Sequence, residues 1–277
     1  MNTRLDQYID GIQTLPPTPT LMVELLALFR EPDRDIDQVV ELISHDPALT
    51  AEVLKNCNSA FYGSDQPVAD LFEAVMRLGF YEVYRFVLAM LGSRALSVPE
   101  AEAGINVALL WDHSLTTAVA AGVLARELGE AEGEPFTAGL LHDVGKIVLA
   151  TKEKGKYALL SQKAGGCGWA LVGAEQGFLG FDHAEIGAHL LARWGLPRHV
   201  NMAIHHHHGL SGAEPFERLA AVVFLANEMA HKAKSEAPVS PDVWQSSAEA
   251  MELIHVSPER VSALMADVHD GLLRFRS

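Results

Sequence analysis

A histidine and an aspartate, His142 and Asp143, stand side by side in the otherwise apolar segment 136–149, FTAGLLHDVGKIVL. Burying an imidazole and a carboxylate without partners is unfavourable, so they should pair with each other or with a backbone carbonyl, or bind a cation. Neighbouring residues on a helix diverge by about 100°, so both reach one metal ion only from a helix end. Lys146 follows one turn later and either donates to phosphate oxygens at this site or extends to solvent.

Four further histidines fall on inward positions of predicted helices. One lies on the apolar stripe of helix 105–128, and one follows Asp182 at the start of a helix with a capping-box sequence. Two share a helical face with Val200 and Ile204, whereas His205 and His206 point elsewhere. These four are His113, His183, His207 and His208. So many inward imidazoles favour a metal site over histidines that merely fill a core.

Besides the residues named above, the sequence offers few candidate metal ligands. Imidazole and carboxylate ligands suit Mn, Fe, Ni or Zn better than copper(I). The only cysteines, Cys57 and Cys167, form no paired motif, which excludes a disulfide framework and a thiolate zinc site. Cys57 is expected to be a packed small residue. The remaining histidines share no face and are expected at the surface or as helix caps: His45, His189, His199, His231, His255 and His269.

Charge and hydropathy limit the classes of protein that fit. The 277 residues carry 21 Lys and Arg against 36 Asp and Glu, a net charge of −15, which disfavours binding to nucleic-acid phosphates. The N-terminal residues lack the apolar segment of a signal peptide. Charged residues interrupt the most apolar stretch, 80–98, which argues against a membrane span. We expect a cytoplasmic protein that binds neither nucleic acid nor membrane.

The elements that must position these side chains are helices. Apolar residues recur with helical rather than alternating spacing almost throughout the chain, so the predicted fold class is all-α. Asp46 and Pro47 mark the start of one helix, and Pro99 marks the best internal boundary. A polar tract, 235–247, precedes the last helix. The predicted helices cover residues 20–30, 36–43, 47–57, 68–78, 80–96, 105–128, 136–150, 157–164, 183–194, 197–208, 215–234 and 258–272.

Several of these segments resemble a known superfamily. WDHSLTTAVAAGVLAREL around His113, LLHDVGKIVL, HAEIGAHLLARWGLP and AIHHHHG resemble the HD superfamily of metal-dependent phosphohydrolases. LPPTPTLMVELLALF, ISHDPALTAEVLKNCNSAFYG and LFEAVMRLGFYEVYRFVLAM are similar to the N-terminal part of the HDOD domain, the HD-related output domain. The resemblance implies an HDOD domain over 15–232, with an N-terminal helical lobe (15–97), an HD-type helical lobe (98–232) and a C-terminal helical tail (233–277).

The resemblance also implies roles for individual residues. His113, His142 and Asp143 match the first HD metal ligands, and Lys146 matches a lysine that follows the His-Asp pair in related HD-GYP phosphodiesterases. Three more match histidines that hold a second metal in those enzymes: His183, His207 and His208. Asn227 stands where HD enzymes place a final aspartate ligand, and it supplies a neutral oxygen in place of a charged one. Gly209, Leu210 and Ser211 replace the acidic residue and Gly-Tyr-Pro signature, which argues against cyclic di-GMP hydrolysis.

Three functions are compatible with this pattern. The leading one is a bacterial regulatory output module that transmits a signal through contacts with signalling proteins. The second is a metal-dependent phosphohydrolase acting on a nucleotide or cyclic dinucleotide, in which one or two ions (Fe, Mn, Ni, Zn or Mg) assist hydrolysis. There Asp143 would bridge the ions or orient the nucleophile, and Lys146 would offset phosphoryl charge. The third is a sensor that binds a phosphorylated small molecule without hydrolysing it. The sequence leaves the oligomeric state open.

Overall fold

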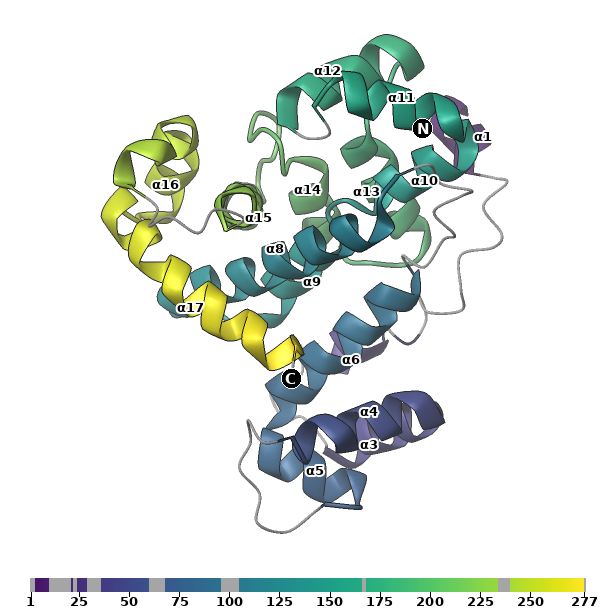
Figure 1. The fold of residues 1–277 in the computed structure, drawn as a ribbon, viewed down its shortest axis with the longest axis vertical. Coiled ribbons are helices and arrows are strands. Elements are labelled where there is room, and N and C mark those ends of the chain that lie inside the picture. The colour runs from purple at the N-terminus through teal and green to yellow at the C-terminus, as the bar shows by residue number, and fades with distance from the viewer. Residues whose placement is uncertain are drawn as a thin grey trace.

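The computed structural model describes residues 3–9, 21, 24–28, 36–59, 68–95, 105–165, 168–233 and 240–276. Every regular element within these ranges is a helix, which confirms the all-α prediction (Figure 1). The predicted helix 20–30 is described only at residues 21 and 24–28, which are helical. The predicted boundary at Pro99 lies outside the described residues.

An N-terminal group of helices forms the lower part of the molecule as drawn in Figure 1. Its elements are α3 (Ile36–Ser44), α4 (Pro47–Cys57), α5 (Leu71–Leu78) and α6 (Phe80–Ala95). Asp46 caps α4 as predicted, since its side chain accepts from the backbone N–H groups of Ala48 and Leu49, and Pro47 occupies the first turn. Cys57 is a buried core residue, as expected. The preceding helix α1 (Thr3–Ile9) instead packs against α13 (His183–Arg193).

The helix α8 (Val107–Glu127) runs through the upper part of the molecule and packs against α9 (Gly133–Leu141), α15 (Glu217–Lys232) and α17 (Pro258–Arg276). Among the described residues it is the one helix that is long and apolar enough to cross a membrane. However, 67% of its most apolar window is buried inside this protein. Its hydropathy is therefore accounted for by the core, where its middle residues pack against neighbouring helices.

Five further helices lie in the upper part of the molecule (Figure 1). They are α10 (Val144–Glu153), α11 (Gly155–Lys163), α12 (Gly168–Leu179), α13 and α14 (Arg198–His205). The capping box predicted for α13 is present: the Asp182 carboxylate accepts from the Glu185 backbone N–H, and the Glu185 carboxylate accepts from that of Asp182. His183 is therefore fixed as the first residue of α13.

Two predicted helices are shorter than the apolar pattern indicated. The predicted helix 136–150 is two helices, α9 and α10, separated at His142 and Asp143. The His142 side chain bonds from Nδ1 to the Gly139 carbonyl oxygen at 2.7 Å, and Asp143 leaves the helical conformation with φ −100° and ψ 9°. Likewise α14 ends at His205, so His207 and His208 lie in a turn rather than on its face.

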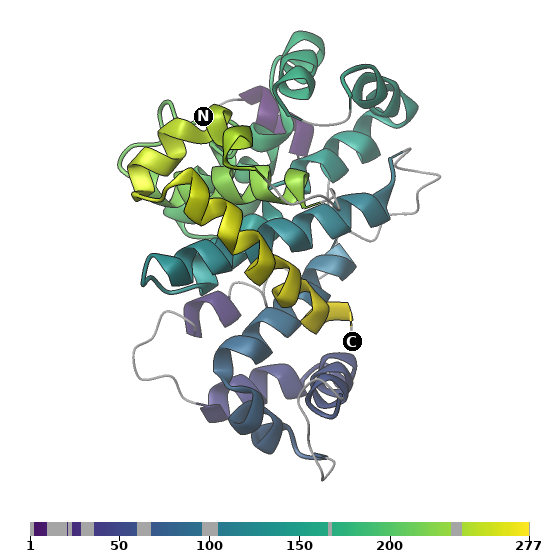
Figure 2. The same cartoon turned by 60° about the vertical axis from the view of Figure 1, so that its left-hand side comes forward.

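The C-terminal segment, which was expected to be a helical tail, packs against the rest of the molecule. Part of the predicted polar tract is a 3-10 helix, η2 (Pro241–Ser247), in which Trp244 is fully buried, and α16 (Ala248–Ile254) follows it. The last helix, α17, then crosses α8 and ends beside α6 (Figure 2). There the ring of Phe275 lies 5.4 Å from that of Phe86 and 6.2 Å from that of Phe136. Helix α17 thus contacts both α6 and α9.

Candidate metal centre

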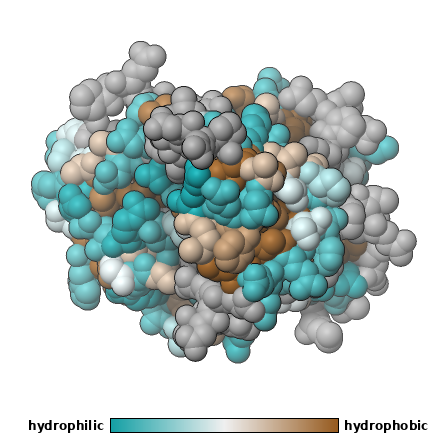
Figure 3. Space-filling model, turned by 90° about the horizontal axis from the view of Figure 1, so that it is seen from below, coloured by the Kyte–Doolittle hydropathy of each residue, from teal (hydrophilic) through white to brown (hydrophobic). Residues whose placement is uncertain are grey.

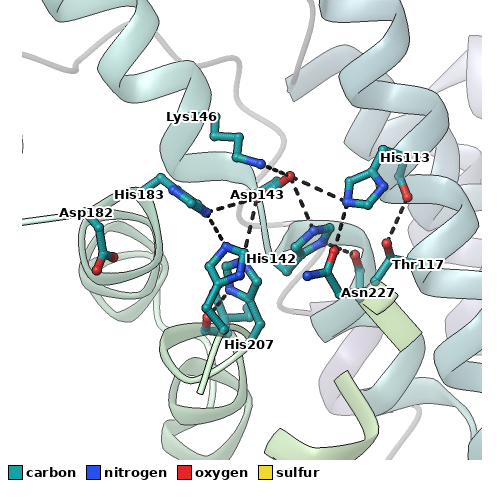
Figure 4. Close-up of polar contacts among 12 residues, drawn as sticks. His113, Thr117, His142, Asp143, Lys146, Asp182, His183, His207 and Asn227 are labelled. Carbon is teal, nitrogen blue, oxygen red and sulfur yellow. Dashed lines mark hydrogen bonds and ion pairs between the residues drawn. The ribbon is translucent and has the colours of Figure 1, made fainter. Parts of the chain in front are cut away.

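Asp143 lies at the centre of the candidate site and is 1% exposed (Figure 4). Its Oδ2 accepts a hydrogen bond from Lys146 Nζ at 2.7 Å and lies 3.3 Å from His142 Nε2 and 3.8 Å from His113 Nε2. Its Oδ1 lies 3.4 Å from His183 Nε2 and 3.7 Å from His207 Nε2. One carboxylate therefore faces histidines from both directions.

The candidate ligands form two groups that share Asp143. In each group the ligand atoms lie within 4.8 Å of one another, and every member is buried. The paired-histidine side consists of Asp143, His113 and His142; the three-histidine side consists of Asp143, His183, His207 and His208. The structure thus brings together all six residues that the sequence singled out as metal ligands.

The elements explain why these side chains meet. His113 points inward from the middle of α8, and His183 begins α13. At the break between α9 and α10, His142 keeps helical backbone angles but Asp143 does not, so two neighbouring side chains can face one region. His207 and His208 enter from the turn after α14, which replaces the helical face that the sequence predicted. The prediction that they point inward is confirmed, although the reason given for it is wrong.

Hydrogen bonds fix three imidazoles in one tautomer. His142 Nδ1 lies 2.7 Å from the Gly139 carbonyl oxygen, His207 Nδ1 lies 2.6 Å from that of Ile204, and His183 Nδ1 lies 2.6 Å from Glu175 Oε2. Each oxygen can only accept, so each Nδ1 carries the proton and each Nε2 lone pair faces Asp143. Metal-binding histidines are characteristically held in this way by an outer partner.

Glu175 is a functional candidate that sequence reasoning missed. It is fully buried on α12, where Oε1 accepts from the Tyr157 hydroxyl at 2.6 Å. Its Oε2 accepts from the His183 backbone N–H at 3.0 Å as well as from the His183 ring. The signal available in the sequence is one carboxylate in the otherwise uncharged segment GWALVGAEQGFL.

The unpaired atoms of the cluster test whether a cation fits. Among the described residues, the buried side-chain atoms without a hydrogen-bond partner include Asp143 Oδ1, His142 Nε2 and His207 Nε2. Buried polar atoms are rarely left unpaired, because each loses its bonds to water without replacement. All three are electron-pair donors that face the centre of the cluster. A divalent cation would pair them all, so the donor set fits a metal.

Burial also keeps the histidines in their ligating form. It lowers the pKa of His113 and of His207 well below the ordinary value and lowers that of His208 to about 2. Burial alone would raise the pKa of Asp143, but attraction to the Lys146 ammonium helps to hold it well below its ordinary value. Neutral imidazoles and an ionised carboxylate are the forms that bind metals.

Asn227 and His231 lie beside His113. The Asn227 Oδ1 atom is 2.9 Å from His113 Nε2, so the helix that was expected to supply a final ligand does reach the site. The His231 ring stacks on His113, with centroids 4.5 Å apart and an interplanar angle of 28°. The expectation that His231 is a surface or capping group is wrong, because α15 turns it toward the site together with Asn227.

A cavity of about 360 Å³ opens beside the cluster. Polar groups of the cluster form one part of its wall, and Ile105, Leu109 and Leu110 form another. The polar lining residues include His113, Asp143, Lys146, Tyr157, Ser161 and His231. Lys146 is 8% exposed and bonded to Asp143, so of the two readings of this lysine the structure supports contact with the site over extension into solvent.

Comparisons with known proteins agree with this architecture. A crystal structure from Shewanella amazonensis SB2B, of a protein whose assignment as a phosphohydrolase is provisional, is 29% identical with a TM-score of 0.75 and covers 98% of this chain and 96% of that one. The MmoQ response regulator from Methylococcus capsulatus str. Bath is 28% identical with a TM-score of 0.52, covering 92% of this chain and 98% of that one.

An uncharacterized protein of Treponema pallidum (strain Nichols) is 29% identical over 230 residues, which are 79% of this chain and 42% of that protein. The chain thus spans less than half the length of this curated relative. The sequence itself matches the HDOD domain over residues 15–210. A match of that extent, on an all-helical fold with a buried His/Asp cluster, shows that this chain belongs to the HDOD domain family.

Proposed function

We propose that this chain is a metal-binding regulatory module of the HDOD family, acting in the bacterial cytoplasm through contacts with signalling proteins. The observation that carries the metal-binding part is the set of buried, unpaired donor atoms around Asp143, each turned inward by an outer hydrogen bond. The residues available to hold one or two divalent ions, in two groups that share Asp143, are His113, His142, Asp143, His183, His207 and His208.

The regulatory part is supported by where the cluster lies. His183, His207 and Asp143 come from separate elements, and bonds to one ion would hold α13, the turn after α14 and the start of α10 together. Occupancy of the site would therefore alter the packing of the upper helices, which is the kind of two-state change that a partner can detect.

Apolar side chains suited to protein contact are exposed on the N-terminal lobe, among them Phe72 and Met76 of α5. Apolar surface gathers near the centre of the view from below (Figure 3).

Metal content of the untagged protein tests this proposal. The histidine run supplies matched variants: His207→Ala removes a cluster ligand, whereas His205→Ala removes a neighbouring histidine outside the cluster. After loading with Mn, Fe, Ni, Zn or Mg and removal of free ion, the wild type and His205→Ala should retain metal, and His207→Ala should lose it. Absence of bound metal in the wild type, or equal retention in both variants, would contradict the proposal.

A phosphohydrolase function is the second candidate, favoured by the cavity that Asp143 and Lys146 line. A bound ion would supply Lewis acidity toward a phosphate group and lower the pKa of water. Asp143 would hold that ion, and the Lys146 ammonium would donate to a phosphate oxygen. The neutral amide of Asn227 supplies neither a charged ligand nor a base.

A phosphodiesterase screen separates the two functions. The metal-loaded protein would be tested with bis-p-nitrophenyl phosphate, nucleotides and cyclic dinucleotides. Turnover that disappears in Lys146→Met would support the enzyme. Metal binding without turnover would support the regulatory module, with a phosphorylated small molecule as a ligand that the cavity could bind without hydrolysis.

A further inference from the structure

We propose that the cluster binds a single ion tightly, on its three-histidine side, and that the Lys146 ammonium takes the place of a second ion on the paired-histidine side. This inference rests on the proposed metal binding and specifies where the ion lies. The side that contains the His142-Asp143 pair would then be the weaker one.

The two carboxylate oxygens of Asp143 are in different electrostatic environments. Oδ2 already accepts a hydrogen bond from Lys146 Nζ at 2.7 Å, and this ammonium is nearly buried. A dication bound to the same oxygen would lie close to a positive charge in a poorly solvated site, where repulsion is strong. Oδ1 is buried and has no partner. A cation is therefore opposed more strongly at Oδ2 than at Oδ1.

His113 is held in the wrong tautomer for an ion on the paired-histidine side. Its Nε2 lies 2.9 Å from Asn227 Oδ1, an oxygen that accepts hydrogen bonds, so Nε2 carries the proton. The lone pair is then on Nδ1, which is buried without a partner. A ligating Nε2 would first have to give up its proton and its bond to Asn227. The neutral Asn227 also contributes no negative charge to this side.

On the three-histidine side, two of the histidines are already in the ligating tautomer. His183 and His207 direct bare Nε2 atoms toward Oδ1, because their Nδ1 protons are bonded to Glu175 and to a backbone carbonyl. Glu175 adds a buried carboxylate behind His183, where it accepts from the Tyr157 hydroxyl and from the backbone and ring of His183. His208 Nε2 lies 2.9 Å from His183 Nε2, and the single proton between them is the one that an ion would displace.

The spacing of these four ligand atoms suits one small ion. Bonds of about 2.0–2.2 Å in tetrahedral arrangement place neighbouring ligand atoms roughly 3.3–3.6 Å apart. The separations here are 2.9 Å between the two Nε2 atoms of His183 and His208, and 3.4 and 3.7 Å from Asp143 Oδ1 to His183 and His207. Small side-chain rotations suffice to reach the tetrahedral values.

Four protein ligands complete a tetrahedral shell. Tetrahedral zinc sites closed by four protein ligands serve structure, whereas hydrolytic ones keep a position for water. An ion enclosed in this way would bind α10, α13 and the turn after α14 together without exposing a reactive water. The inference therefore deepens the regulatory function and not the hydrolytic one.

Stoichiometry and coordination geometry test the inference together. The untagged protein would be loaded with Zn²⁺ and weighed by native mass spectrometry, and loaded separately with Co²⁺, whose visible absorption is strong when tetrahedral and weak when octahedral. One ion per chain and a strong cobalt spectrum are expected. Two ions of comparable affinity, or a weak octahedral spectrum, would overturn the inference while leaving metal binding intact. Failure to bind any ion would overturn the proposed function as well.

Matched ligand deletions locate the ion. His208→Ala should lower zinc affinity by more than the roughly 10–100-fold typical of losing an outer-shell partner. His113→Ala should leave zinc affinity within a few-fold of wild type. The reverse ranking would place the ion on the paired-histidine side. Circular dichroism of each zinc-free variant checks that its helices are retained, so that loss of zinc reports the ligand and not unfolding.

A gain-of-binding variant provides a test that misfolding cannot mimic. Lys146→Met combined with Asn227→Asp removes the competing ammonium and supplies a carboxylate, so it should add a second ion to the first. Asn227→Asp alone should add it more weakly, because Lys146 remains. If the double variant still binds one ion, the role assigned to Lys146 and Asn227 is wrong.

Discussion

Gly145 and His183 are in direct backbone contact: a Cβ atom at Gly145 would lie 1.9 Å from the His183 carbonyl oxygen. Glycine is therefore the residue that permits α10 and α13 to approach this closely. Gly187, one turn further along α13, faces the same contact, since its own Cβ would lie 3.1 Å from the Gly145 nitrogen. This approach sets the distance between Asp143, just before α10, and the His183 ring.

Gly145→Ala should separate the two helices and disrupt the candidate site. We expect a loss of about 1–3 kcal/mol in the free energy of unfolding, as for other overpacked cores, together with weaker metal binding. Gly177→Ala in α12 is the matched control, because a Cβ there meets nothing within 4 Å and alanine favours the helix. Urea denaturation of both variants checks this; similar stabilities would show that α10 and α13 can move apart freely.

Glu175→Gln should weaken metal binding while preserving the fold. Glutamine keeps the shape of the side chain but loses the charge, so it holds the Nδ1 proton of His183 less firmly. The expected loss in metal affinity is about 10–100-fold. Tyr157→Phe removes the other side-chain bond of Glu175 and leaves the bonds to His183, so its effect should be smaller. Calorimetric titration compares the two, and equal losses would argue against a positioning role for Glu175.

Phe275→Ala should loosen the contact that α17 makes with the N-terminal lobe. Its ring packs against Phe86 and Phe136, and the neighbouring Arg274 forms an ion pair with Glu82 at 2.6 Å. We expect a loss of about 1–3 kcal/mol, because the ring is only partly buried. Leu273→Ala, at a position 46% exposed, should change stability by less than about 0.5 kcal/mol. Thermal unfolding of both variants is the measurement. Equal losses of stability would contradict a specific contact between Phe275 of α17 and the N-terminal lobe.

The metal-free protein should lose stability as the pH falls below about 6.5. The folded pKa of His208 is lowered to about 2, and those of His113 and His207 are also lowered well below the ordinary value. Below pH 6.5 the unfolded chain therefore binds protons that the folded chain does not, so the free energy of unfolding falls by about 1.4 kcal/mol per pH unit for each such histidine. Above pH 6.5 these groups are neutral in both states, so their contribution to the free energy of unfolding does not change with pH.

Urea denaturation of the metal-free protein between pH 7.5 and 5 measures this slope. His207→Gln removes one of the titrating groups and should reduce the slope by about one proton. An unchanged slope in that variant would indicate that His207 already takes up a proton in the folded state.

The sequence predicted the parts of the site that depend on local pattern. Apolar spacing located α8 and the inward His113, and cap residues located the starts of α4 and α13. The apolar pattern did not predict the helix end that is set by a side chain bonding to a backbone carbonyl. Nothing in the spacing of residues 136–150 shows that His142 bonds to Gly139 and ends the helix, because apolar positions continue on both sides.

Contacts between residues distant in the sequence were the second feature that could not be predicted. Glu175 is the one charged residue of α12, and its role exists only because α12 places it beside His183. His231 is the single histidine of α15 and was expected at the surface or as a helix cap, yet it stacks on a ring from α8. These contacts are set by how helices pack, which a one-dimensional pattern does not record.

The position of Asp143 between two groups of histidines bears on how such a site can change over evolutionary time. A substitution at His113 or His208 affects the ligands of one side, whereas a substitution at Asp143 removes an oxygen from both. One half can therefore degenerate, as the amide at position 227 exemplifies, while the other stays under selection. Within related sequences that retain any metal, this aspartate should be the last ligand to be replaced.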